Sequence, residues 1–268
     1  MDTLDVVIVT FIGLAAGLLG GLAGVGGSMV MIPGLGLVFG YTAAAGKPEQ
    51  HLYAAAAMLV NVLVSLPAAL RHKKAGAVRF DVFKMLAPAM AVAIVVGVVI
   101  SNTFDGSVLK RALAVFILAY CAMNIYRVFR KRPEGERAAE RLTPLRVLIV
   151  ASVGGLTAGI LGLGGGVVIV PMLQILCKMR LREAIATSLA TMAVTAVIGA
   201  AVKIGTLPEH GQSIKTALLY AAALGPGAIL GGRLGAGLNH RLPLGAVRIS
   251  ISILLMLVAA KQLDLLPF

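Results

Sequence analysis

Long apolar runs with few charged positions recur along almost all of the 268 residues. Such a run, about 18 residues or longer, is typical of a helix that spans a membrane, because the hydrocarbon core is about 30 Å thick. The candidate spans are Leu4–Leu22, Leu52–Leu70, Val82–Ser101, Val108–Tyr126, Leu145–Leu163, Ala184–Val202, Ile214–Gly232 and Val247–Lys261. Two shorter apolar segments, Ser28–Gly40 and Val167–Cys177, follow glycine-rich stretches. The pattern predicts an all-α integral membrane protein with about ten membrane segments.

Composition and charge agree with a membrane protein. Hydrophobic residues make up 59% of the chain and charged residues 13%, and the mean hydropathy is +0.96. Soluble domains carry about 25% charged residues. If the ten segments alternate across the bilayer, 18 of the 24 Lys and Arg residues fall on one side, which the positive-inside rule makes the cytoplasm. This bias accounts for the net charge of +13, so we expect a lipid bilayer and no nucleic acid as partner.

The chain repeats itself at a shift of 138 residues, which places Gly17–Pro33 on Gly155–Pro171 with eight of 17 positions identical. We expect residues 1–129 to be one membrane repeat, 130–144 a cytoplasmic linker and 145–268 a second repeat. Each repeat has five segments, an odd number, so the second repeat is inverted and both termini lie on the non-cytoplasmic side. Inverted repeats with glycine-interrupted segments at corresponding places are typical of secondary transporters.

The glycine stretches GVGGS (24–28) and GLGGG (162–166) interrupt the apolar pattern. The helix after each is predicted to be about 11 to 13 residues, under 20 Å, and so begins or ends inside the membrane. A helix amino end offers unpaired N–H groups and attracts anions. The predicted substrate-binding residues here are Gly24, Gly26, Gly27, Ser28, Gly162, Gly164, Gly165 and Gly166. The alternative, close helix packing, is favoured for Gly17, Gly21, Gly155 and Gly159.

Polar residues inside the other spans are further candidates. Asn61 and the run Thr187, Ser188 and Thr191 are predicted to contact substrate, although membrane Thr also bonds its own i−4 carbonyl. Arg233 is predicted to gate the path or attract anions, unless it extends to the surface. Lys203 is expected at the outer mouth or in solvent. The four histidines fall in predicted connections, so no metal site and no cofactor is expected.

GLGGGVVIVP, its altered copy GVGGSMVMIP, ATSL at Ala186–Leu189 and GAILGGRLGAGL at Gly227–Leu238 resemble the sulfite exporter TauE/SafE family, also called TSUP. The resemblance implies a prokaryotic inner-membrane transporter for sulfite, sulfonates and related sulfur-containing anions. The first repeat departs from the family pattern, since Ser28 replaces a third glycine and AAAM at Ala55–Met58 replaces ATS. More of the site is therefore expected in the second repeat.

The leading hypothesis is a secondary transporter of small sulfur-containing oxyanions that works by alternating access. A transporter of another small anion, such as a carboxylate, keeps the same fold. An intramembrane enzyme is not expected, because the spans show neither a G-x-S-G nucleophile nor paired Asp residues. The sequence is compatible with a homo-oligomer and leaves the direction of transport and the coupling ion open.

Overall fold

The computed structural model describes residues 2–23, 26–40, 49–129, 141–238 and 244–263, and these are helical without strands. The helices are α1 Thr3–Ala23, α2 Ser28–Phe39, α3 Gln50–Lys74, α4 Phe80–Asn102, α5 Gly106–Phe129, α6 Pro144–Leu161, α7 Gly166–Leu176, α8 Leu181–Gly205, the 3₁₀ turn η1 Leu207–His210, α9 Ile214–Leu238 and α10 Leu244–Gln262. The predicted all-α fold is confirmed.

The helix lengths separate membrane spans from interrupted segments as the apolar pattern predicted. Seven of the described helices are long and apolar enough to cross a membrane: α1, α3, α4, α5, α6, α8 and α9. The 19-residue helix α10 covers the eighth predicted span. The two shorter apolar helices, α2 and α7, have 12 and 11 residues and start directly after the glycine stretches. The chain is a multi-pass membrane protein.

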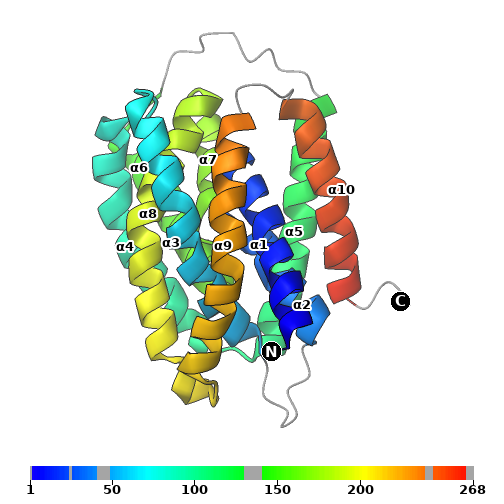
Figure 1. Ribbon diagram of the computed structural model, residues 1–268. Helices are drawn as coiled ribbons and strands as arrows, with labels where there is room; N and C mark the ends of the chain where they lie inside the picture. The colour runs from blue at the N-terminus through cyan, green and yellow to red at the C-terminus, as the bar shows by residue number, and fades with distance from the viewer. Residues whose placement is uncertain (1, 24–25, 41–48, 130–140, 239–243, 264–268) are drawn as a thin grey trace.

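The two halves of the chain run in opposite directions through one bundle (Figure 1). Helix α1 begins at the lower end of the view, whereas α6 begins at the upper end. The main helix contacts correspond under the 138-residue shift, because α1 packs along α9 and α6 packs along α4. Helices α3 and α8 contact each other between these pairs, and α5 pairs with α10. Each of these helix contacts in one half of the chain therefore has a counterpart under the shift.

Glycines allow the backbones of these helix pairs to touch. A Cβ built on Gly17 of α1 would lie 2.8 Å from the carbonyl carbon of Ala228 in α9. In the equivalent pair, a Cβ on Gly159 of α6 would lie 2.6 Å from the backbone nitrogen of Val98 in α4. Gly155 makes the same kind of contact with α4. The helix-packing interpretation of these three glycines is confirmed, and small residues have this role in membranes.

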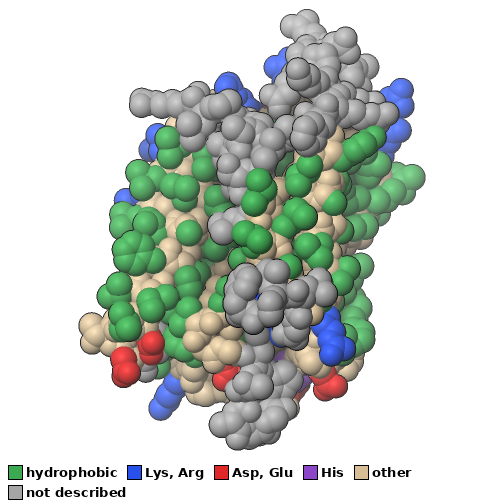
Figure 2. All heavy atoms as spheres, turned by 90° about the vertical axis from the view of Figure 1, so that its right-hand side faces the viewer, with side chains coloured by type: hydrophobic (Ala, Val, Ile, Leu, Met, Phe, Trp, Pro, Cys, Tyr) green, Lys and Arg blue, Asp and Glu red, His purple; other side chains and the backbone are tan. Residues whose placement is uncertain are grey.

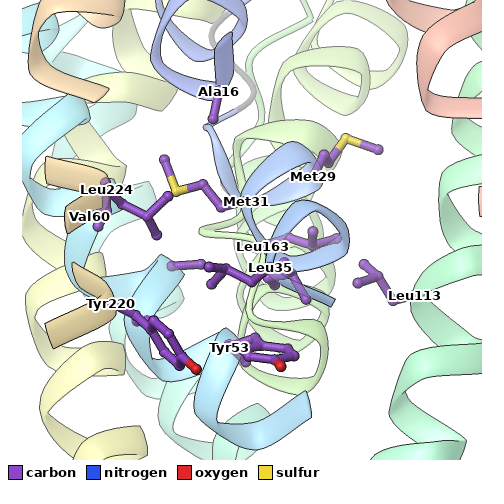
Figure 3. Close-up of a cluster of buried hydrophobic side chains, with 14 of the residues drawn as sticks. Ala16, Met29, Met31, Leu35, Tyr53, Val60, Leu113, Leu163, Tyr220 and Leu224 are labelled. Carbon is purple, nitrogen blue, oxygen red and sulfur yellow. The ribbon is translucent and has the colours of Figure 1, made fainter. Parts of the chain in front are cut away.

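The surface and interior of the bundle suit a lipid environment. Hydrophobic side chains cover the middle of the face in Figure 2, and acidic side chains gather near its lower end. One buried cluster joins α2, α3 and α9, with Leu35, Tyr53 and Leu224 among its members (Figure 3). Leu163, from the second glycine stretch, lies in this same cluster. A residue of the second glycine stretch is therefore part of a core to which both halves of the chain contribute.

Candidate substrate site at the glycine loops

The two glycine loops, residues 26–27 and 162–165, connect each long first helix of a repeat to its short helix. Helix α6 ends where the Gly162 N–H donates to the carbonyl of Ala158 at 2.9 Å. Gly164 and Gly165 then adopt φ values of +71° and +85°, a region that side chains with a Cβ rarely enter. The carbonyl of Gly165 accepts the first hydrogen bonds of α7. A sharp turn with left-handed residues is thus what the glycines supply.

The two glycine loops meet at the side chain of Asn61. The Gly27 amide donates to Asn61 Oδ1 at 3.2 Å, and Asn61 Nδ2 donates to Ser28 Oγ at 2.6 Å. From the other repeat, a Cβ built on Gly164 would lie only 2.6 Å from Asn61 Nδ2. A Cβ on Gly26 would lie 3.3 Å from the carbonyl oxygen of Leu163. Asn61 therefore bridges the start of α2 and the loop before α7.

The junction of the loops lies halfway along the two central helices. Asn61 is the twelfth of 25 residues in α3, and Met192 is the twelfth of 25 in α8. Met192 also fits between the loops, since its Sδ lies 3.1 Å from a Cβ built on Gly164. Asn61, Ser28 and Met192 are all 0% exposed. Side chains therefore fill the junction of the two glycine loops.

The family assignment rests on the comparison with known proteins. The sequence profile of the family described as sulfite exporter TauE/SafE matches residues 9–262. The chain belongs to the sulfite exporter TauE/SafE family. The matched residues include both glycine loops and Asn61.

Relatives of the chain are named as probable membrane transporter proteins. YunE of Bacillus subtilis is 24% identical over 95% of this chain and 96% of its own length. A protein of Methanocaldococcus jannaschii is 26% identical over 92% of this chain and 91% of its own length. MamO of Magnetospirillum gryphiswaldense is 28% identical over 97% of this chain, which spans only 45% of MamO. No solved structure matches the chain.

Most of the predicted site residues of this TauE/SafE member are brought together, with some differences. Gly26, Gly27, Ser28, Asn61 and Gly164 meet at the junction described above, whereas Gly24 lies outside the described residues. The other three glycines of the second loop pack close by. A Cβ on Gly162 would lie 2.7 Å from the Ala54 side chain, one on Gly165 would overlap the Met90 methyl group, and Gly166 is buried as the first residue of α7.

Two threonines of α8 donate to their own i−4 carbonyls, which is the alternative to substrate contact. Thr191 Oγ1 donates to the carbonyl of Thr187 at 2.9 Å, and Thr195 Oγ1 donates to that of Thr191. Thr187 Oγ1 accepts from the backbone amide of Arg79, which precedes α4, at 3.1 Å. Thr187 therefore ties α8 to the first repeat near the upper end of the bundle. Ser188 differs, because its buried hydroxyl has no partner among the described residues.

Arg233 lies away from the glycine loops. Its side chain is exposed near the upper end of α9, and its carbonyl oxygen accepts a 3.4 Å hydrogen bond from Arg71. This position fits the alternative in which the side chain extends to the membrane surface.

Replacing Thr187 by valine is expected to lower stability without altering transport. The variant removes the acceptor of the Arg79 amide in a part-buried hydrogen bond, which costs about 1 kcal/mol. Thr187→Ser keeps an oxygen and is expected to retain most of that stability. Unfolding titrations in mixed micelles measure both variants. Equal stability of Thr187→Val and the unaltered protein would contradict the assigned contact.

Two residues at the lower end differ from what the sequence indicated. His51 was expected in a connection but lies inside α3 and is 1% exposed. Lys203 was expected at the outer mouth or in solvent, and because it is 2% exposed the solvated alternative is wrong. The Lys203 Nζ lies 2.7 Å from His51 Nδ1. The residues Met192, Ala196, Gly199 and Lys203 share one buried face of α8, so the periodicity could have revealed Lys203. Because lysine is usually exposed to solvent, Lys203 was not expected to be buried.

Proposed function

We propose that this chain is a secondary transporter that moves small sulfur-containing oxyanions, such as sulfite or an organosulfonate, across the membrane by alternating access. The observation that carries the proposal is the junction of two glycine loops at Asn61, halfway along the central helices. The family description, sulfite exporter, supports the chemical class of the cargo. Interrupted helices facing each other at mid-depth are typical of such transporters.

The donors at the junction fit an oxyanion. When Asn61 rotates away from Gly27, the freed Gly27 amide, the Asn61 carboxamide N–H₂ and the Ser28 hydroxyl all become donors for the cargo. The start of α2 adds the positive end of its helix dipole. The methionines that contact the loops, Met90 and Met192, are unbranched and flexible, so they can move to make room. Neutral donors suit a cargo that must be released again.

We further propose that residues 1–129 and 145–268 are inverted repeats that move against each other around this site. The upper end in Figure 1 carries the basic turns after α3 and α7, with Arg71, Lys73, Lys74, Lys178, Arg180 and Arg182. By the positive-inside rule it faces the cytoplasm. Both termini then lie on the non-cytoplasmic side of a prokaryotic inner membrane. The glycine loops are reached alternately from each side.

Asn61→Asp is the variant that tests the site. Aspartate keeps an acceptor for the Gly27 amide, but it replaces the N–H₂ donor and repels an anion. We expect sulfite uptake into proteoliposomes to fall at least about tenfold, corresponding to a loss of one charge-assisted hydrogen bond of about 1.5–3 kcal/mol. Asn124→Asp, at another buried amide in α5, is the matched control and is expected to retain uptake.

The cargo is tested by competition. Sulfite and methanesulfonate are expected to inhibit each other's uptake, and acetate at the same concentration is expected to inhibit neither. Inhibition by acetate alone would move the proposal to a carboxylate transporter with the same site. Uptake by Asn61→Asp at the rate of the unaltered protein would remove Asn61 from the site.

A further inference from the structure

A buried lysine lies at the lower end of the bundle in Figure 1, away from the glycine loops. Lys203, near the end of α8, is 2% exposed. Its Nζ lies 2.7 Å from His51 Nδ1 and donates to Ser101 Oγ at 2.8 Å and to Asn102 Oδ1 at 2.9 Å. Lys203 follows Met192 by eleven residues, about 16 Å along a helix axis. The Lys203 cluster, made of Lys203 and its three acceptors, is therefore separate from the junction of the loops.

The ammonium group of Lys203 has three acceptors but no negative charge beside it. His51 Nε2 lies 3.1 Å from the carbonyl oxygen of Phe104, so Nε2 carries the ring proton and Nδ1 accepts from Lys203. Within the described part of the chain no carboxylate pairs with Lys203. The nearby carboxylate of Glu49 instead accepts from the Tyr53 hydroxyl. A buried cation in a span is costly and usually marks the path of an ion.

A second buried polar group beside the cluster lacks a partner. His210, from η1, stacks on the ring of His51 with centroids 3.9 Å apart. Its Nε2 is buried and has no hydrogen-bond partner among the residues that the structure describes. Burial, and then the charge of Lys203, lower the pKa of His210, while the exposed Glu209 opposes this. Buried polar atoms are nearly always paired, so this nitrogen also indicates that a ligand binds here.

The cluster borders solvent on one side and packed apolar side chains on the other. Asn102 is half-buried, and its hydrogen bond to Lys203 is the one of the three that is only partly buried. Toward the glycine loops, a Cβ built on Gly199 would lie 2.6 Å from Ile94 Cδ1 and 3.1 Å from Met58 Cε. An ion from solvent can therefore reach Lys203 by displacing Asn102, but it passes further only when this apolar layer opens.

We propose that the Lys203 cluster is a second anion-binding site, which receives the oxyanion at the outer side before it reaches the glycine loops; this inference rests on the proposed function. An oxygen of the anion replaces Asn102 Oδ1 at the Lys203 ammonium, and the freed Asn102 amide and His210 Nε2 are available as further donors. The anion and the ammonium stabilise each other, because each supplies the opposite charge that the other lacks. A cation at this end also raises the local concentration of anions.

The outer site is tested by the stability that an anion confers on the full-length Asn61→Asp chain, in which the site at the glycine loops is impaired. Methanesulfonate, at about ten times its Kd, is expected to raise the thermal unfolding midpoint in detergent micelles by about 3–6 °C. Dimethyl sulfone has a similar shape without the charge and is expected to leave the midpoint unchanged. Sodium gluconate keeps the ionic strength constant. Equal shifts with the two compounds, or no shift with either, would overturn the site without any change at Lys203.

Variants of Lys203 assign the stabilisation to its ammonium group. Lys203→Met removes the charge and is expected to abolish the shift with methanesulfonate, whereas Lys203→Arg keeps the charge and is expected to retain the shift. Lys215→Met changes an exposed lysine at the start of α9, at the same end of the bundle, and is the matched control that should keep the full shift. A shift that persists in Lys203→Met shows that the anion binds elsewhere and overturns the outer site.

Uptake into proteoliposomes separates the outer site from the proposed function. If methanesulfonate stabilises the chain through Lys203 but neither methanesulfonate nor sulfite is taken up, the proposed function fails and the outer site stands. If both anions are taken up but the shift does not depend on Lys203, the proposed function stands and the outer site fails.

Discussion

Replacing Gly227 by alanine is expected to lower the stability of the bundle more than adding a methyl group at any other position of α9. A Cβ at this position would overlap the carbonyl oxygen of Thr10 and lie 2.7 Å from the backbone nitrogen of Leu14. Both are backbone atoms of α1, so no side chain can rotate to make room. Helices α1 and α9 must separate along their length. We expect a loss of about 3 kcal/mol, the upper end of the usual range for overpacking.

The measurement is a reversible unfolding titration in mixed micelles, with Gly205→Ala as the control. A Cβ on Gly205, at the end of α8, meets no atom within 4 Å, so its effect is expected to stay within about 1 kcal/mol. Gly159→Ala, in the equivalent contact between α6 and α4, should lose as much stability as Gly227→Ala. Equal stability of Gly227→Ala and Gly205→Ala would show that α1 and α9 are not in backbone contact.

Much of this fold could be predicted because membrane spans leave a strong signal in the sequence. Length and hydropathy locate the long helices, and the short helices α2 and α7 follow from where the glycines interrupt the apolar runs. The packing role of Gly17, Gly155 and Gly159 followed from their four-residue spacing. Gly227, Gly231 and Gly235 have the same spacing in α9 and contact α1 in the same way. Their packing role could therefore have been predicted from the same spacing.

The site was harder to predict, because it depends on contacts between residues far apart in the chain. Glycine density indicated the loops, but nothing local indicated that Asn61 would bridge them or that Met192 would fill the space between them. The polar run of α8 looked like one binding face. In the fold, Thr187 instead bonds the Arg79 amide near the upper end. Hydrophobic periodicity reports burial, but it does not report which partner a buried polar group finds.

Gly164→Ala is expected to abolish transport. The alanine strains the backbone and also clashes with Asn61, and Gly76→Ala is the control that separates these two effects. Gly164 and Gly76 both have positive φ, +71° and +67°, so alanine strains the backbone at each by about 1–2 kcal/mol. A Cβ on Gly76 meets no atom within 4 Å, whereas one on Gly164 would lie 2.6 Å from Asn61 Nδ2. Gly76→Ala is therefore expected to transport sulfite normally. Gly164→Ala displaces the Asn61 carboxamide from Gly27 and Ser28, and uptake is expected to fall below detection.

The double variant Gly164→Ala with Asn61→Ala decides whether that loss comes from Asn61. Shortening Asn61 removes the clash, so the double variant should recover part of the stability lost in Gly164→Ala, an interaction energy of about 0.5–3 kcal/mol between neighbouring sites. Transport should not recover, because the donor at the junction of the loops is gone. Additive stability losses would mean that Gly164 and Asn61 do not touch. Recovered uptake would mean that the cargo is held by the backbone amides of the glycine loops alone, since these are then the donors that remain on both sides of the junction.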